Sequence, residues 1–345
     1  MMSPDELSAG LVRDAVAPMC AAGWARRAAR VSGGETDVFF DLASVTKPMM
    51  ALAWARSGLD RATPLGTLVE EARGTASERV PVELLLAHRA GLDAHRTLYA
   101  PLVTGGQVDR RAALREAASA RRADAQGEPP EEGFAPIYSD LGFALAGEAL
   151  ARATGARDAG EAIERLVLEP MGLAGKAGTV RGLAERGVRG PFAPTETVAW
   201  RGGPVVGAVH DENAWALTGL GGSGHAGIFA TIDAVLTFGV RTLDAIEADA
   251  SLAWLVRPRS GGTLRAGFDG KSPPPEVSSA GTRAGARTFG HLGFTGTSLW
   301  IDPDARVVVA LLTNRVCPTR EHVAIRAARP RAHDALFEHA MASGA

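Results

Sequence analysis

Residues 40–47 read Phe40-Asp41-Leu42-Ala43-Ser44-Val45-Thr46-Lys47, and they join a predicted short strand, 37–40, to a predicted helix, 44–56. Residues three apart share one face of a helix, so the hydroxyl of Ser44 and the amine of Lys47 can meet. The helix N-terminus also offers unpaired N–H groups and a partial positive charge, which suit a developing anion. A serine hydroxyl is a weak nucleophile until a base takes its proton, and a lysine is a base only if its pKa falls. The alternative is a capping serine followed by a surface lysine, because so short a motif often matches by accident.

The composition makes this lysine informative. Lysine and arginine total 37 residues, but the lysines are only Lys47, Lys176 and Lys271. Arginine can replace lysine wherever a surface charge is needed, but it cannot lose a proton at usable pH. Tyrosine is also scarce, with only Tyr99 and Tyr138.

Length, charge and hydropathy exclude several classes of protein. The 345 residues are 46% apolar and 22% charged, which argues against disorder, and the net charge of −2 gives no basic excess for nucleic acid or anionic lipid. No apolar run approaches the roughly 20 residues that a membrane span needs. The first six residues lack the features of a secretory signal, and Cys20 and Cys317 are too few for a disulfide framework. We therefore expect a cytoplasmic globular protein with no nucleic-acid partner and no membrane span.

Hydrophobic periodicity changes twice along the chain. Helical and strand-like segments come first, a mostly helical block follows, and strand-like segments return after residue 260. Ser3 and Glu6 predict the start of the first helix as a capping box. The predicted strands are 24–31, 37–40, 263–268, 288–292, 297–301 and 307–312, and the predicted helices after residue 66 are 82–88, 108–122, 141–154, 159–168, 211–217, 233–246 and 330–341.

This order predicts an α/β (α+β) fold in which terminal helices flank an antiparallel sheet and a mostly helical domain is inserted into it. We expect residues 1–65 and 255–345 to form the discontinuous sheet domain and residues 66–254 the helical domain. A turn at 302–304 between the last two predicted strands indicates an antiparallel hairpin.

Two further segments carry chemistry. Tyr138-Ser139-Asp140 precedes the predicted helix 141–154, and a tyrosine beside a cation loses its proton more readily. Taken singly, Asp140 could be an N-cap and Tyr138 a packing residue. The run 290–297 lies in the C-terminal strands, where glycine on an edge strand lets a substrate backbone approach. His291 in that run can be a cation, a hydrogen-bond donor or a residue packed in the sheet.

The ordered set resembles the serine β-lactamase and penicillin-binding-protein superfamily, and most closely its class C-like branch, which also contains esterases and D-amino-acid peptidases. The resemblance rests on residues 40–47, 84–92, 138–143, 224–229, 290–297 and 302–303, so it covers nearly the whole chain.

The resemblance implies a role for each residue. Ser44 would attack an acyl carbon, and Lys47 and Tyr138 would share the work of general base and then protonate the leaving group. The backbone N–H groups of Ser44 and Phe294 would form the oxyanion hole. No metal or organic cofactor is implied. The residues implied to line the substrate cleft are Asp140, His291 and Gly293.

Two positions depart from the family pattern. Asp140 stands where penicillin-acting members usually have Asn, and a carboxylate near Lys47 favours the ammonium form. We therefore predict that Tyr138 carries more of the base role. Leu292 replaces a hydroxyl that helps to hold a substrate carboxylate, which predicts weak recognition of β-lactams.

The sequence thus predicts a serine hydrolase that acts on a small or peptide-like ester or amide through an acyl-Ser44 intermediate. The alternatives are a true β-lactamase or D,D-peptidase, and a catalytically silent binding module with the same fold. The run 222–227 matches G-x-G-x-x-G, but it lies in a helical block without the βαβ context of a dinucleotide site. The run 209–213 holds three potential metal ligands, yet successive residues diverge around a helix, so we expect a helix start there.

Overall fold

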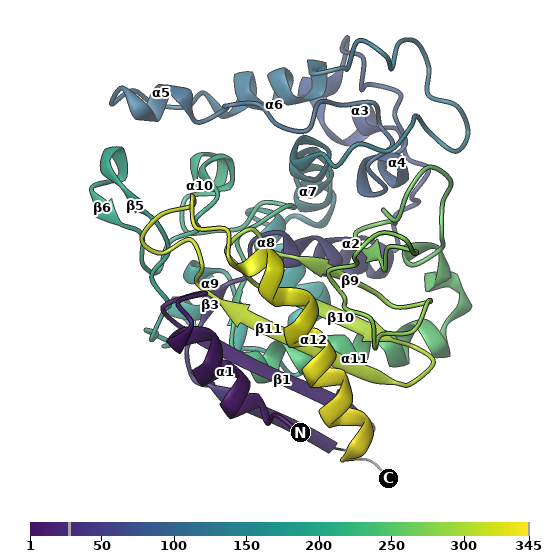
Figure 1. Ribbon diagram of the computed structural model, residues 1–345. Helices are drawn as coiled ribbons and strands as arrows, with labels where there is room; N and C mark the ends of the chain where they lie inside the picture. Colours follow the sequence, from purple (N-terminus) through teal and green to yellow (C-terminus); the bar gives the residue numbers. More distant parts are fainter. Residues whose placement is uncertain (27–28, 344–345) are drawn as a thin grey trace.

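A computed structural model describes residues 1–26 and 29–343 of the chain (Figure 1). Its main sheet has six antiparallel strands in the order β2-β1-β11-β10-β9-β8. Every residue of β11 is buried, which explains its continuous apolar sequence in the middle of the sheet. The strands are β1 (Cys20–Arg26), β2 (Ala29–Gly34), β8 (Asp269–Gly270), β9 (Phe289–Leu292), β10 (Ser298–Asp302) and β11 (Val307–Thr313).

The two terminal helices, α1 (Pro4–Arg13) and α12 (Ile325–Ala342), cover one face of this sheet, as predicted (Figure 1). The expected capping box begins α1, with Ser3 and Glu6 each accepting a hydrogen bond from the other's backbone N–H. Helix α12 begins five residues before the predicted start, so Pro330 lies inside it rather than at its first turn. A separate apolar cluster joins both helices to the sheet; its large members include Leu7, Leu11, Trp24, Trp300, Leu336 and Phe337.

Helix α11 (Ile232–Ala248) packs on β1, β10 and β11 from the other side. Its Gly239 faces the sheet so closely that a Cβ there would lie 2.5 Å from Cγ1 of Val308. In sequence α11 belongs to the predicted helical domain, 66–254, whereas in space it packs against the sheet. The division into two domains stays a prediction.

Among the remaining helices, α7 is buried along most of its length and contacts α2, α3, α4, α6 and α8. The remaining helices are α2 (Thr46–Arg56), α3 (Leu65–Leu68), α4 (Val82–Leu86), α5 (Ala100–Val103), α6 (Arg110–Ser119), α7 (Asp140–Thr154), α8 (Ala159–Ile163), α9 (Val180–Glu185) and α10 (Glu212–Thr218). The 3₁₀ segments are η1 (Ala43–Val45), η2 (Glu70–Ala72), η4 (Ala199–Arg201) and η5 (Ala250–Leu255), and a π-helical turn, η3 (Glu164–Leu168), continues α8. Two small sheets pair β3 (Phe40–Asp41) and β4 (Ala177–Gly178) with β7 (Phe229–Ala230), and β5 (Thr197–Val198) with β6 (Gly203–Pro204).

Two predicted strands are wrong. The segment 24–31 belongs to two antiparallel strands, β1 and β2, in which Trp24 pairs with Val31; residues 27 and 28 lie outside the described residues. The segment 263–268 makes a single bridge, between Leu264 and Asp269, and β8 follows it. Gly267 explains this difference, because it has a φ of +83° and packs against α2, where a Cβ would lie 2.3 Å from that of Ala51.

The predicted hairpin at 302–304 is present. Asp302 Oδ1 accepts hydrogen bonds from the N–H groups of Asp304 and Ala305 and so closes the turn between β10 and β11. Among the described residues, no helix has both the length and the apolar character that crossing a bilayer would require.

Two helix glycines should respond in opposite directions to the same substitution. Gly239→Ala places a methyl group against Val308 in the closed α11–sheet interface, so we expect a loss of about 1–3 kcal/mol in the free energy of unfolding. Gly10→Ala in α1, where the nearest atom is the end of the Arg13 side chain at 3.5 Å, should gain about 0.5–1 kcal/mol. Urea unfolding of both variants checks this, and equal effects would contradict the packing described for α11.

Candidate active site

Ser44 lies in η1, at a turn that the side chain of Asp41 holds in place. The preceding residue, Ala43, has a φ of +46°, a strained conformation for a residue with a Cβ. Asp41 accepts a hydrogen bond from the N–H of Ala43 at 2.8 Å and another from the N–H of His210 at 2.7 Å. Burial raises the pKa of this carboxyl group, against the lowering effect of the two N–H donors. Asp41 therefore ties the backbone just before Ser44 to the segment at His210, which holds the Ser44 turn in place.

The N-terminal ends of α2 and α7 bring four predicted residues together around one amine. Lys47 Nζ donates to Ser44 Oγ at 2.8 Å, to the Tyr138 hydroxyl at 2.7 Å and to Asp140 Oδ1 at 2.6 Å. The Lys47 side chain has no exposed surface, and its Nζ lies 4.6 Å from the centroid of the Tyr138 ring. Three acceptors thus satisfy the three protons of a buried ammonium group.

The start of α7 positions Tyr138 and Asp140. Ser139, not Asp140, is the N-cap, because its Oγ accepts from the N–H of Gly142 at 3.3 Å. The N–H of Ser139 donates to Nδ1 of His88 at 2.9 Å, and the His88 ring stacks on Tyr138 with centroids 4.6 Å apart. Sequence reasoning gave His88 no role, although it lies within the run 84–92 that carried part of the family resemblance.

Both groups that the resemblance assigns as bases hold their protons at neutral pH. Burial lowers the pKa of Lys47, but the charge and hydrogen bonds of Asp140 and Tyr138 outweigh it and raise the pKa overall. Burial raises the pKa of Tyr138, and the charge of Asp140 adds to this against the effect of Lys47. The site therefore contains an ammonium and a phenol beside the Asp140 carboxylate.

A cavity of about 400 Å³ opens at Ser44. Of the predicted residues, Ser44, Tyr138, Asp140, Gly293 and Phe294 line it. His291 does not, because its buried ring lies beside Tyr138, with centroids 5.8 Å apart, and its Nδ1 lies 2.7 Å from the carbonyl oxygen of Leu292. Burial and the charge of Lys47 lower the pKa of His291 to about 3, so its ring is neutral at pH 7.

The backbone of Gly293 and Phe294 is tied to the segment that precedes Ser44. A Cβ on Gly293 would lie 2.5 Å from the carbonyl oxygen of Leu42. Thr295 donates to the carbonyl of Asp41 at 2.7 Å, and Thr297 donates to that of Leu42 at 2.9 Å. These contacts hold the turn after β9 beside the nucleophile turn.

Arginines form one wall of the cavity, and sequence reasoning missed them because arginine is common throughout the chain. Arg329 is buried at the start of α12 and donates to the carbonyls of Gly293 and Thr297 at 2.6 and 2.9 Å. Burial, together with the charge of Arg315, lowers its pKa to about 10. Within residues 1–26 and 29–343, neither Arg329 nor Arg315 forms an ion pair with a carboxylate. This wall therefore carries uncompensated positive charge.

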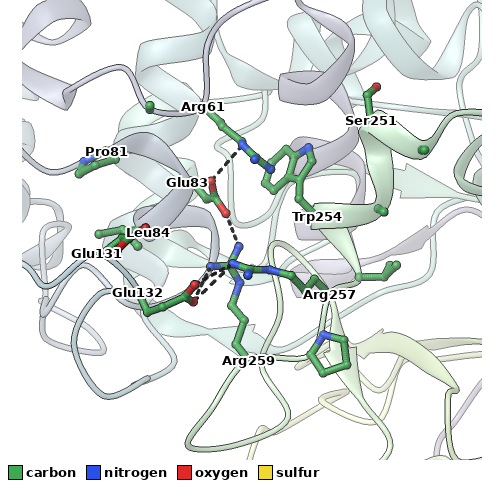
Figure 2. A pocket seen from close by; sticks show the side chains of 15 residues that line it. Arg61, Pro81, Glu83, Leu84, Glu131, Glu132, Ser251, Trp254, Arg257 and Arg259 are labelled. Atoms are coloured by element: carbon green, nitrogen blue, oxygen red, sulfur yellow. Dashed lines mark hydrogen bonds and ion pairs between the residues drawn. The ribbon is translucent and has the colours of Figure 1, made fainter.

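A second cavity, of about 830 Å³, lies apart from Ser44, and Figure 2 shows its lining. Its charged side chains pair with one another: Arg61 lies 3.1 Å from Glu83, Arg259 also contacts Glu83, and Arg257 lies 3.2 Å from Glu132. These pairs join α4 to the loop around residue 132 and to the segment after η5. Because that loop leads directly into Tyr138, the network supports the start of α7.

The remaining sequence motifs have structural roles. Asp211 caps α10 by accepting from the N–H of Ala214, as the predicted helix start requires, and its Oδ1 also lies 2.9 Å from Nε2 of His225. In the run 222–227, a Cβ on Gly224 would lie 2.0 Å from the carbonyl oxygen of Phe143, so this glycine permits close packing on α7. Among the residues that the structure describes, no group of three His, Cys, Asp or Glu side chains is arranged to hold a metal ion.

Comparisons with known proteins identify the family of the chain. The family model described as Beta-lactamase matches residues 12–333, and the chain belongs to that family of serine hydrolases. An Escherichia coli (strain K12) protein named "Putative D-alanyl-D-alanine carboxypeptidase" is 26% identical over 209 residues, which cover 54% of this chain and 46% of that protein. The matched region thus spans about half the length of this relative.

Solved structures share the fold over nearly the whole chain. A beta-lactamase from Mycobacterium bovis has a TM-score of 0.62 at 22% identity, with 96% of this chain and 98% of that chain covered. EstCE1, described as a hydrolase with promiscuous acyltransferase activity, has a TM-score of 0.68 at 19% identity, with 96% of each chain covered. Both likenesses confirm the predicted fold class.

The buried neutral histidines should make the protein sensitive to acid. Burial, with the charge of Lys47, lowers the pKa of His88 well below its ordinary value and that of His291 to about 3. Between about pH 6.5 and 3 the unfolded chain binds a proton at His291 that the folded chain does not, and His88 acts in the same direction, so stability falls as pH falls. His291 contributes up to about 1.4 kcal/mol per pH unit in that window. Urea unfolding from pH 7 to 5 should give a shallower slope for His291→Gln than for wild type, and equal slopes would contradict the neutral ring.

Proposed function

We propose that this protein is a serine hydrolase that transfers the acyl group of an ester or amide to water through an acyl-Ser44 intermediate. One observation carries the proposal: a single buried amine, Lys47 Nζ, contacts both the Ser44 hydroxyl and the Tyr138 hydroxyl at the mouth of the cavity. A nucleophile within hydrogen-bond reach of its proton-transfer groups is the arrangement that acyl transfer needs.

In the proposed reaction, Ser44 Oγ passes its proton to the groups around Lys47 Nζ as it forms a bond to the acyl carbon, and the carbonyl oxygen becomes an oxyanion. Ser44 and Phe294 line the same cavity, and their N–H groups would stabilise that charge. Tyr138 and Lys47 would then deliver a proton to the leaving group as its bond to carbon breaks. A water molecule would release the acyl group by the reverse sequence of proton transfers.

The arginine wall favours a second candidate, a peptidase or β-lactamase whose substrate carries a carboxylate. Arg315 and Arg329 are buried on this wall and face the cavity with no acidic partner in the described part of the chain. A substrate carboxylate would compensate their charge. The D-alanyl-D-alanine carboxypeptidase named among the relatives acts, by its name, on a substrate with such a group. Leu292, which also lines the cavity, lacks the hydroxyl that the resemblance leads us to expect beside that carboxylate.

Covalent labelling tests the acyl-enzyme directly. Incubation with p-nitrophenyl butyrate followed by intact-mass analysis should show one butyryl group on the wild-type protein and none on Ser44→Ala. Ser57→Ala, at the opposite end of α2, should label like wild type. A wild-type protein that never gains mass with esters, amides or nitrocefin would contradict the proposal and favour the silent binding module.

The Leu292 position tests the carboxylate-bearing substrates. Leu292→Thr adds a hydroxyl at the cavity wall, and a hydrogen bond to a charged group is worth about 1.5–3 kcal/mol. We expect kcat/KM for benzylpenicillin to rise about tenfold or more relative to Leu292→Val, which has the same shape without the hydroxyl. Equal values for the two variants, or efficient turnover by wild type, would refute the predicted role of Leu292.

A further inference from the structure

The groups around Ser44 do not include an obvious base that could take the proton of its hydroxyl. Ser44 must lose a proton, yet Lys47 and Tyr138, the two groups within reach, both have raised pKa values and hold their own protons at pH 7. The carboxylate of Asp140 is the only acidic side chain that contacts Lys47 among the described residues. It is therefore the group beside the amine with the capacity to take up a proton.

Among the residues that the structure describes, no second carboxylate or histidine contacts Lys47 Nζ and competes with Asp140 for a proton. His88 is neutral, but its Nδ1 already accepts a hydrogen bond from the N–H of Ser139. His291, in β9, is also neutral, and its Nδ1 lies beside the carbonyl oxygen of Leu292. Asp211, on the loop before α10, exerts a weaker charge effect on the site and lies 2.9 Å from His225.

Asp140 lies where it could exchange a proton with Lys47, and the α7 helix does not use its side chain as the N-cap. Ser139 already caps α7, so the helix does not need the Asp140 side chain for that purpose. The Asp140 side chain is 23% exposed and lines the cavity, whereas Lys47 is completely buried. An acyl substrate in the cavity would remove water from the carboxylate, and loss of water favours the neutral form of an ion pair.

We propose that Asp140 is the terminal proton acceptor of the acylation step, acting through Lys47; this inference rests on the proposed acyl-Ser44 chemistry. One proton of the Lys47 ammonium moves to Asp140 Oδ1, which frees the lone pair of Nζ. As Ser44 Oγ bonds to the acyl carbon, its proton moves to that lone pair. The carbonyl π electrons become the oxyanion. The net charge stays at zero: an ammonium and a carboxylate become an ammonium, a carboxylic acid and an oxyanion.

The same pair then completes the reaction. When the tetrahedral intermediate collapses, the carbon–leaving-group bond breaks, and Lys47 supplies a proton to the leaving group through the Tyr138 hydroxyl. Asp140 returns its proton to Lys47 and regains its charge. An asparagine at this position could accept a hydrogen bond from Lys47 but could not store the proton.

The sign of one pH shift tests the proposal. If Asp140 accepts the proton, Asp140→Asn moves the acid limb of the acylation rate upward by about one pH unit or more, because the base becomes the Lys47 amine. If Lys47 or Tyr138 is the base in wild type, removal of the carboxylate lowers their pKa values and moves the limb downward. The measurement is the burst rate of p-nitrophenol release from p-nitrophenyl butyrate, by stopped flow, between pH 4 and 10.

Two further variants keep the test independent of folding. Asp140→Glu retains a carboxylate, so its acid limb should stay at the wild-type pH even if the acylation rate falls. Asp109→Asn removes the same charge at the exposed N-cap of α6 and should leave the profile unchanged. Near-ultraviolet circular dichroism confirms that each variant is folded.

An acid limb that stays in place or moves downward in Asp140→Asn overturns the proposed role of Asp140 while leaving the hydrolase itself intact. Absence of any butyryl adduct on wild type overturns the hydrolase instead. The two failures are therefore distinguishable in the same set of proteins.

Discussion

Lys47 carries its charge in a position that water does not reach, and most of the structure around the cavity exists to compensate that charge. Removing an ammonium group from water costs several kcal/mol unless hydrogen bonds and an opposite charge replace the hydration. Here the replacement comes from two elements that are distant in sequence, the turn at Ser44 and the start of α7. Displacing either element would leave the ammonium with fewer acceptors than protons, so the buried charge ties the two elements together.

Residues that pack around the site keep the surroundings of Lys47 buried and hold the catalytic candidates in position. Gly267 lets the segment before β8 approach α2 so closely that any larger residue would meet Ala51. The His88 ring stacks on the ring of Tyr138. The ion pairs in Figure 2 hold the loop that leads to Tyr138. The strain at Ala43 is held by the buried Asp41 carboxylate. None of these residues needs to touch the substrate, because each one positions Ser44, Lys47 or Tyr138.

The long elements of the fold could be predicted from the sequence because their signals are local. The alanine-rich helix after Ser44, the helix that became α7 and the β10–β11 hairpin are each apolar runs with clear boundaries in the sequence. The errors at 24–31 and 263–268 arose where tertiary contacts decide, since Trp24 pairs with Val31 across a hairpin and Gly267 turns toward α2. The convergence of Ser44, Lys47 and Tyr138 was predictable only from the ordered set of motifs. Arg329 gave no signal, because one arginine in this composition has no distinguishing spacing, and His88 stood out only as a member of the run 84–92.

The order of the strands also bears on how the protein is made. Strand β1 pairs with β11, and its Cys20 lies opposite Thr313. During synthesis β1 therefore leaves the ribosome long before its central partner exists, while the helices of the insert can already pack locally. Until then the apolar β1 has only β2 as a neighbouring strand, which exposes it to aggregation.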